Sequence, residues 1–128
     1  AVQELEETLQ RGEENTGSHY VFLENDSGAM LAYASYYPIP ITRECWTLDW
    51  IAVQPENQGL GYASVLMEAV AGAVRTKKGG YLFSEVSALP ASEPSRRCHA
   101  KNNFEIMAQI QDFYKPGDGK IIYRRRLR

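Results

Sequence analysis

Cysteine, long apolar runs and net charge are all scarce in this sequence. Its two cysteines, Cys45 and Cys98, lie far apart and form no metal-ligand spacing, so we expect no metal site. No stretch approaches the roughly 18 apolar residues that a membrane-spanning helix needs, and no secretory signal is visible. The formal net charge of -2 argues against a protein that binds nucleic acid through phosphate contacts. We therefore expect a cytoplasmic protein that binds neither membrane nor nucleic acid.

The rest of the composition is ordinary for a globular protein. Hydrophobic residues make up 44% and charged residues 23% of the 128 residues, which predicts one domain with a single core over residues 1–128. No internal repeat, low-complexity tract or interdomain linker divides the chain. The one basic run, residues 124–126 with Arg128, is interpreted as the solvated face and end of an edge strand.

Periodicity and turn residues predict strands and helices in alternation. Residues 104–111 show the clearest two-residue alternation and predict a half-buried strand, whereas apolar residues at helical spacing predict a buried helix over 62–77. Because a helix can connect parallel strands and hairpins can join the others, we expect an α/β (α+β) fold, a mixed sheet flanked by helices. The predicted helices are 1–11, 62–77 and 92–102, and the predicted strands are 19–24, 29–37, 45–53, 81–87, 104–111 and 120–127.

The most informative segment joins a predicted strand to a predicted helix through a loop with two glycines. Gly59 and Gly61 would let the backbone approach a ligand closely, and the unpaired N–H groups at the start of a helix bind anions such as a pyrophosphate. A Rossmann fingerprint would need glycine or alanine where Ser64 stands, and a P-loop would need Gly-Lys-Ser/Thr. By itself the spacing also fits a plain strand-loop-helix turn.

A longer pattern around this loop is more specific. Residues Gln58-Gly59-Leu60-Gly61-Tyr62-Ala63, which follow Ile51-Ala52-Val53 and Pro55, resemble the Q/R-x-x-G-x-G/A motif of the GCN5-related N-acetyltransferases (GNAT). Segment 95–104 resembles that family's A-x-x-F-Y-x-x-x-G-F segment, and segment 112–118 resembles the D-Y-Y-x-x-G-D loop of several small bacterial and archaeal members. The resemblance extends over about residues 19–127.

This resemblance implies a GNAT acyl-CoA N-acyltransferase fold that binds acetyl-CoA. The loop residues Gln58, Gly59, Leu60, Gly61, Tyr62 and Ala63 would hold the pyrophosphate through backbone N–H groups. The strand that ends in Ile51, Ala52 and Val53 would diverge from strand 81–87, and the pantetheine arm would pair with its backbone. A backbone N–H near Val53 would hold the oxyanion. Family members usually begin with a strand and a helix that this sequence lacks, so we expect part of the acceptor site to lie outside it or in another chain.

Three residues are candidates for catalysis. Asp49 would share a strand face with Ile51 and Val53 and act as general base or proton relay, although the family often carries a glutamate slightly upstream on this face. Glu85, in the middle of strand 81–87, is the second candidate. His99 stands where many members have a tyrosine that protonates the leaving thiolate, and a histidine can donate a proton or hydrogen-bond the sulfur. Each also has a structural interpretation: a solvated or ion-paired strand residue for the acids, a surface helix position for His99.

Several other residues are assigned by their chemistry. Tyr36, Tyr37, Trp46 and Tyr114 either line an acceptor pocket or belong to the core. Cys98 is expected in the core rather than as a nucleophile.

Together these features predict an enzyme that transfers an acetyl group from acetyl-CoA to a primary amine by direct attack on the thioester. A catalytically degenerate acetyl-CoA-binding sensor or scaffold is the alternative, because the usual tyrosine and first strand are absent. A purely structural domain would leave the glycine spacing unexplained. The sequence does not identify the amine, and a homodimer formed through exposed edge strands near residues 120–127 stays open.

Overall fold

The structure, a computed structural model, describes residues 2–5, 10–11, 14–15 and 17–128. Among these residues, seven strands form one mixed sheet in the order β1-β4-β5-β6-β7-β9-β8, and β2 and β3 form a separate two-stranded sheet. The elements are β1 Val2–Leu5, β2 Gln10–Arg11, β3 Glu14–Asn15, β4 His19–Glu24, β5 Met30–Pro38, β6 Cys45–Val53, η1 Pro55–Asn57, α1 Tyr62–Thr76, β7 Tyr81–Ser87, η2 Pro90–Ser92, α2 Glu93–Lys101, β8 Glu105–Lys115 and β9 Asp118–Arg126.

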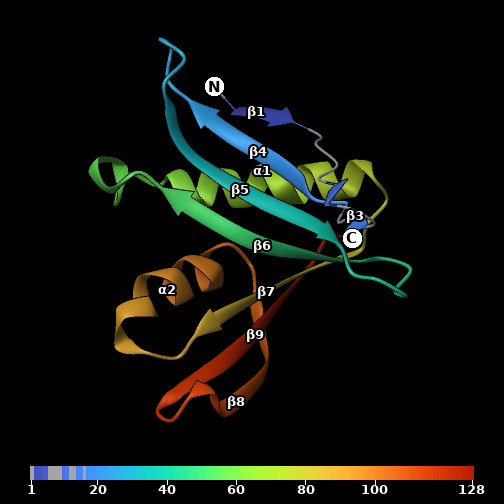
Figure 1. Ribbon diagram of the computed structural model, residues 1–128, viewed down its shortest axis with the longest axis vertical. Helices are drawn as coiled ribbons and strands as arrows, with labels where there is room; N and C mark the ends of the chain where they lie inside the picture. Colours follow the sequence, from blue (N-terminus) through green and yellow to red (C-terminus); the bar gives the residue numbers. More distant parts are fainter. Residues whose placement is uncertain (1, 6–9, 12–13, 16) are drawn as a thin grey trace.

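The sheet consists of two antiparallel parts that meet at one parallel pair. Strands β4, β5 and β6 form a meander, and β7, β9 and β8 form the second antiparallel part. Strand β7 runs parallel to β6, with α1 as the crossover between them. In Figure 1, α1 crosses β4, β5 and β6 on one side of the sheet, while α2 lies beside β7. The mixed sheet that the sequence predicts is confirmed.

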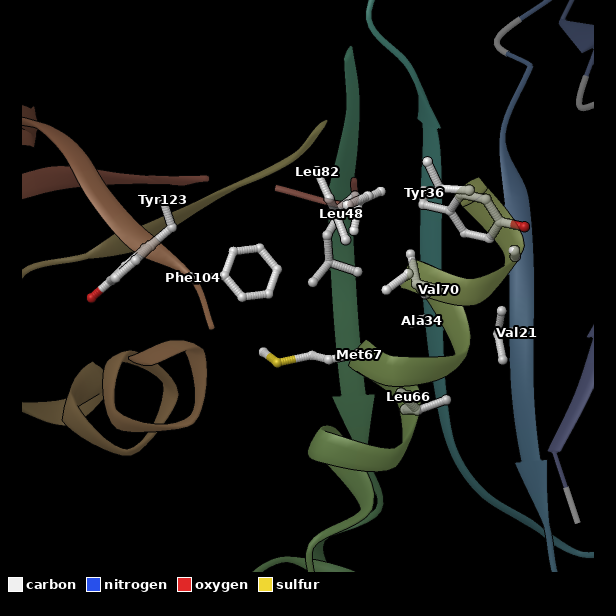
Figure 2. Close-up of a cluster of buried hydrophobic side chains, with 14 of the residues drawn as sticks. Val21, Ala34, Tyr36, Leu48, Leu66, Met67, Val70, Leu82, Phe104 and Tyr123 are labelled. Atoms are coloured by element: carbon white, nitrogen blue, oxygen red, sulfur yellow. The ribbon is translucent and has the colours of Figure 1, made fainter. Parts of the chain in front are cut away.

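The core lies between α1 and the meander. Apolar residues of α1 recur every three or four positions, so Leu66, Val70 and Val74 lie on one face and are fully buried. Figure 2 shows Leu66 and Val70 directed towards the strands that carry Val21 and Ala34. Each such side chain contributes about 1.5–3 kcal/mol by leaving water. This packing holds α1 against β4 and β5.

Helix α1 ends where the backbone and the core approach each other closely. Lys78 adopts φ 66°, the left-handed conformation that follows many helices, and the Gly79 N–H donates to the Val74 carbonyl over 2.8 Å. A Cβ on Gly79 would lie 2.3 Å from Val74 Cγ1 and 2.7 Å from the Trp46 ring. Glycine is required at this position because the first residues of β7 approach the core this closely.

The predicted helix over residues 1–11 is wrong where the structure describes it. Val2–Leu5 is a strand that pairs antiparallel with β4, and Gln10–Arg11 pairs with Glu14–Asn15. Residues 1 and 6–9 of that prediction lie outside the described residues. The free edge of β4 supplies hydrogen-bond partners that a weak helical periodicity cannot match.

The far end of the sheet also differs from expectation. The strand predicted over residues 104–111 is present as the first part of β8, but its predicted half-buried face is wrong, because every residue of β8 is exposed, including Ile106 and Ile110. Phe104, which precedes β8, enters the core. Alternation indicated one apolar face, but β8 is the last strand of the sheet. Strand β9 is interior, between β7 and β8, so residues 118–126 offer no free edge for pairing with a second copy.

The interior position of β9 changes the interpretation of the basic run. Arg125 is only 5% exposed, and its Nη1 lies 2.9 Å from Glu68 Oε1 on α1. Arg124 lies over the ring of Tyr81, 4.9 Å from its centroid. The expectation of a wholly solvated basic face is therefore wrong for Arg125, because its side chain is buried beside Glu68 of α1. None of the helices in the described part of the chain is long and apolar enough to cross a membrane.

The core packing predicts unequal effects for two neighbouring residues of α1. Replacing Leu66, which is 0% exposed, by alanine should lower the free energy of unfolding by about 2–5 kcal/mol, because the deletion leaves a cavity. Replacing Val65, which is 43% exposed, by alanine should change it by less than about 1 kcal/mol. Urea unfolding monitored by circular dichroism measures both. Equal effects of the two substitutions would contradict this packing.

Candidate active site

The parallel pairing of β6 with β7 stops halfway along both strands. The paired residues run from Cys45–Tyr81 to Leu48–Ser84, and beyond them the two strands separate. Figure 1 shows β6 (green) and β7 (olive) diverging towards their C-terminal ends. The divergence predicted from the sequence is thus present, and it begins at Asp49 and Glu85.

A β-bulge stands at the point where the strands separate. Ser35 of β5 pairs with Trp50, but the next residue, Tyr36, pairs with Leu48, so Asp49 has no partner on β5. The bulge breaks the alternation of side chains: Leu48 is buried, while Ile51 packs against the same core cluster. The shared face predicted for Asp49, Ile51 and Val53 is therefore wrong, because the extra residue reverses the parity.

A cavity of about 560 Å³ occupies the opening between the diverging strands and the two helices. All three predicted catalytic residues, Asp49, Glu85 and His99, line it. Of the predicted cofactor-binding residues, four line it, namely Ile51, Val53, Gln58 and Ala63, whereas Ala52, Gly59, Leu60, Gly61 and Tyr62 are not among its walls. The volume is within the usual range of ligand sites.

The glycine loop enters α1 through two left-handed residues. Gly59 has φ 82° and Gly61 has φ 83°, and a Cβ on either would meet no atom within 4 Å, so the backbone conformation rather than crowding selects glycine. The N–H of Val65 is bonded to the Gly61 carbonyl over 3.3 Å, which leaves the preceding N–H groups of the first turn outside the helical ladder. No acidic residue stands in that first turn. The helix start therefore favours an anion.

The edge of β6 next to this loop has free backbone groups. The Gln54 N–H is bonded to the Leu31 carbonyl of β5 over 3.1 Å. Because backbone groups alternate along a strand, the N–H groups of Val53 and Ile51 point to the opposite edge, from which β7 has already separated. These positions can accept an extended, amide-bearing ligand as an added strand.

His99 is buried rather than on the surface. It is 4% exposed and its ring lies 5.0 Å from the ring centroids of both Phe104 and Tyr123. Its Nδ1–H donates to the Ser95 carbonyl over 2.7 Å, so Nε2 accepts from the Ser84 hydroxyl over 2.8 Å. Burial lowers the pKa of His99, and the Ser95 hydrogen bond opposes this in part. The ring is thus a neutral imidazole with both nitrogens engaged.

A second cavity, of about 270 Å³, adjoins the first. Leu48, Asp49, Trp50 and Glu85 line both cavities. Its remaining walls come from Tyr37, Thr47 and Tyr114, all on strands, whereas α1 and α2 contribute only to the larger cavity.

The two carboxylates at this junction differ in their surroundings. Glu85 Oε1 lies 2.8 Å from Lys120 Nζ, and that ammonium also lies 4.2 Å from the centre of the Phe113 ring. Asp49 forms no ion pair among the residues described here. Both carboxylates are near Tyr37: burial chiefly, then the charges of Asp49 and Glu85, raise the pKa of its hydroxyl. Tyr37 is therefore a proton-bearing donor at neutral pH.

The aromatic residues divide between the core and the site. Tyr37 and Tyr114 line the smaller cavity, whereas Tyr36 is fully buried and Trp46 packs against the core. Cys98 is half-buried, packs against the core cluster and lines the larger cavity.

Trp50 and Ser84 are among the wall residues that the sequence analysis did not assign to the site. The exposure of Trp50 depends on the bulge beside it, which the alternation of residues in the sequence does not indicate. Ser84 gave one signal, a polar residue at a core-facing position between buried Leu82 and Val86.

Comparison with known proteins identifies the family of this chain. Residues 2–104 match the Acetyltransferase (GNAT) family. No curated protein sequence matches significantly. A crystal structure from Desulfovibrio desulfuricans, assigned to the GNAT family of acetyltransferases, is 38% identical, with a TM-score of 0.82 over 87% of this chain and 70% of that one.

More distant structures share the fold. An N-acetyltransferase from Staphylococcus aureus Mu50 is 19% identical, with a TM-score of 0.75 over 87% of this chain and 68% of its own. An aminoglycoside 6'-N-acetyltransferase complexed with coenzyme A is 11% identical, with a TM-score of 0.78 over 87% of this chain and 73% of its own.

The state of His99 predicts a pH dependence of stability. The unfolded chain takes up a proton on this histidine near pH 6.5, but the folded protein resists it because its pKa is lowered. The contribution of His99 is therefore complete above about pH 6.5 and is lost as pH falls from there through the folded pKa. Urea unfolding between pH 7.5 and 5 should show this loss in the wild type and a smaller one in His99→Phe and His99→Gln. An unchanged slope in both variants would contradict a neutral buried imidazole.

Proposed function

Because the chain belongs to the GNAT family of acetyltransferases, we propose that it transfers the acetyl group of acetyl-CoA to a primary amine. The observation that carries the proposal is the opening between β6 and β7 with a glycine loop and a helix start at its rim. The carboxylates of Asp49 and Glu85 stand where the opening begins.

The residues present fit the phosphates of coenzyme A. The loop Gln58–Ala63 has two residues without side chains, space around them and a helix start with no acid in its first turn. A pyrophosphate placed there would accept hydrogen bonds from backbone N–H groups, as the sequence resemblance implies. The two amides of pantetheine match the unpaired edge of β6 at Ile51 and Val53.

In the proposed reaction the amine nitrogen attacks the thioester carbon, the C–N bond forms, and the C–S bond breaks to release coenzyme A as a thiolate. The amine arrives as an ammonium, with a pKa near 10.4 for a lysine-like group, so a proton must leave before attack. We assign its removal to Asp49, directly or through a water molecule, because this carboxylate has no cation partner among the described residues. Glu85 is the weaker candidate, since its carboxylate is held by Lys120.

The role proposed for His99 follows from its hydrogen bonds. A neutral imidazole whose only N–H is given to the Ser95 carbonyl has no proton to direct at a thiolate. We therefore propose that His99 positions the Ser84 hydroxyl at the wall of the cavity, in place of the direct proton donation expected from sequence. The thiolate, with a thiol pKa near 8.5, can take its proton from water in this open site.

The second candidate function is a domain that binds acetyl-CoA without catalysis. The observation in its favour is the same one, that His99 cannot replace the family's tyrosine as a donor. The free thiols of Cys45 and Cys98 support the reducing, cytoplasmic compartment that we propose for either function.

Binding of acetyl-CoA is predicted to depend on Gly61. In Gly61→Trp the indole should block the approach of the pyrophosphate, and isothermal titration calorimetry should show at least a tenfold loss of affinity, about 1.4 kcal/mol. Gly28→Trp is the matched control, because Gly28 also has positive φ (86°) and open space but lies in the β4–β5 turn. Failure of the folded wild type to bind acetyl-CoA would refute the proposed function.

Catalysis is predicted to depend on the charge of Asp49. Asp49→Asn should lower kcat by about 10²–10⁴ at pH 7 while acetyl-CoA affinity changes little, since a general base contributes that much. The deficit should shrink towards pH 9.5, because a growing share of the amine is then already neutral. Asp26→Asn, a carboxylate-to-amide change in the exposed β4–β5 turn, serves as the control. Thiol release in a stopped assay measures kcat of both variants across this pH range. If the loss of kcat in Asp49→Asn did not change with pH, Asp49 would be excluded as the base.

A further inference from the structure

We propose that the smaller cavity receives the acceptor and selects small cationic alkylamines that carry no carboxylate beside the amine, rather than free α-amino acids. This inference rests on the proposed acetyl transfer and adds a substrate class to it. The cavity is continuous in its walls with the larger one through Asp49 and Glu85. An amine held there faces the point at which β6 and β7 separate.

The charge balance of the cavity favours a cation. Asp49 and Glu85 bring two negative charges, and Lys120, bonded to Glu85, brings one positive charge. One negative charge remains for the ligand, and it belongs to Asp49. No lysine or arginine is among the wall residues, so an α-carboxylate would find no partner and would face Asp49 at close range.

The other walls suit an ammonium on an apolar chain. Tyr37, Trp50 and Tyr114 place three aromatic residues around the two carboxylates. Aromatic faces attract ammonium groups and also pack against methylene chains. Trp50 is 58% exposed and Tyr114 is 47% exposed, so both have surface left for a ligand to cover. Lys120 on Phe113 beside Glu85 shows the same combination of ammonium, ring and carboxylate within the protein itself.

The volume limits the size of the acceptor. About 270 Å³ is below the usual range for drug-sized ligands, which is roughly 300–1,000 Å³. An unbranched amine of a few carbon atoms fits this space, whereas most of a peptide would remain outside it. The class is therefore a small primary alkylamine, and a diamine gains a second ammonium for the aromatic walls.

The test compares amines of similar length that differ in the group on the carbon that bears the amine. The probes are n-pentylamine, 1,5-diaminopentane, norleucine and norleucinamide, each assayed with acetyl-CoA and the 128-residue protein by thiol release. Because the amine of norleucinamide has a lower pKa and a larger neutral fraction than the other amines, every kcat/KM value is referred to the concentration of the neutral amine. On this scale we expect kcat/KM for norleucine to be at least about tenfold below that for norleucinamide, which has nearly the same shape but no negative charge. On the same scale pentylamine and diaminopentane should be used at least as well as norleucinamide.

A variant shows whether the cavity causes this selectivity. Glu85→Gln removes one negative charge and frees Lys120, so the ratio of norleucinamide to norleucine kcat/KM should fall towards one, whatever happens to the absolute rates. Glu105→Gln, an exposed acid on β8 outside both cavities, is the matched control and should keep the wild-type ratio.

Each outcome decides the inference. If acetyl-CoA does not bind, the proposed function fails and the inference fails with it. If acetyl-CoA binds but norleucine is used as well as norleucinamide, or if Glu85→Gln leaves the ratio unchanged, the substrate class is wrong while the proposed function stands. A norleucyl tetrapeptide used more than tenfold better than every small amine would also overturn it.

Discussion

The separation of β6 from β7 is the constraint on which the site depends. The last parallel pair is Leu48 with Ser84, and each strand is held rigidly on its other side: β6 by β5 and α1, β7 by β9 along its whole length. The two packed halves of the sheet therefore keep the opening in place. The bulge at Asp49 adds local twist to β6 at the same position, so the divergence and the placement of a carboxylate have one physical origin.

The hydrogen bonds and ion pairs of the polar groups in this opening indicate which groups have a structural role and which are available for reaction. His99 gives its proton to Ser95 and receives that of Ser84, and two aromatic rings flank it, so it strengthens the junction of α2 with β7. Buried polar groups are tolerated only when paired in this manner. Glu85 is likewise held by Lys120. Asp49 has no cation partner within the described part of the chain, and both proposals for the site depend on that difference.

Much of the fold was predictable because local signals and tertiary packing agree. Strands 19–24, 45–53 and 81–87 were predicted with the bounds that the structure has, and helix 62–77 extends one residue too far. The wrong predictions concern the two outer strands of the sheet. Val2–Leu5 pairs with the edge of β4, and β8 alternates in sequence yet remains exposed as the last strand. Alternation reports which residues could be buried, not whether another element covers them.

By itself the sequence determined the family and the order of the elements from residue 19 onwards. It also predicted the anion-binding loop, because glycines with positive φ and a helix start are local features of the backbone. It also supplied the list of candidate acids. Only the tertiary structure decided the direction, the partners and the burial of the candidate catalytic residues. The bulge set the direction of Asp49, the passage of β9 brought Lys120 to Glu85, and the packing of α2 on β7 buried His99 as a neutral ring. These depend on residues distant in sequence, so the charge and proton state of each group followed from contacts that no local pattern records.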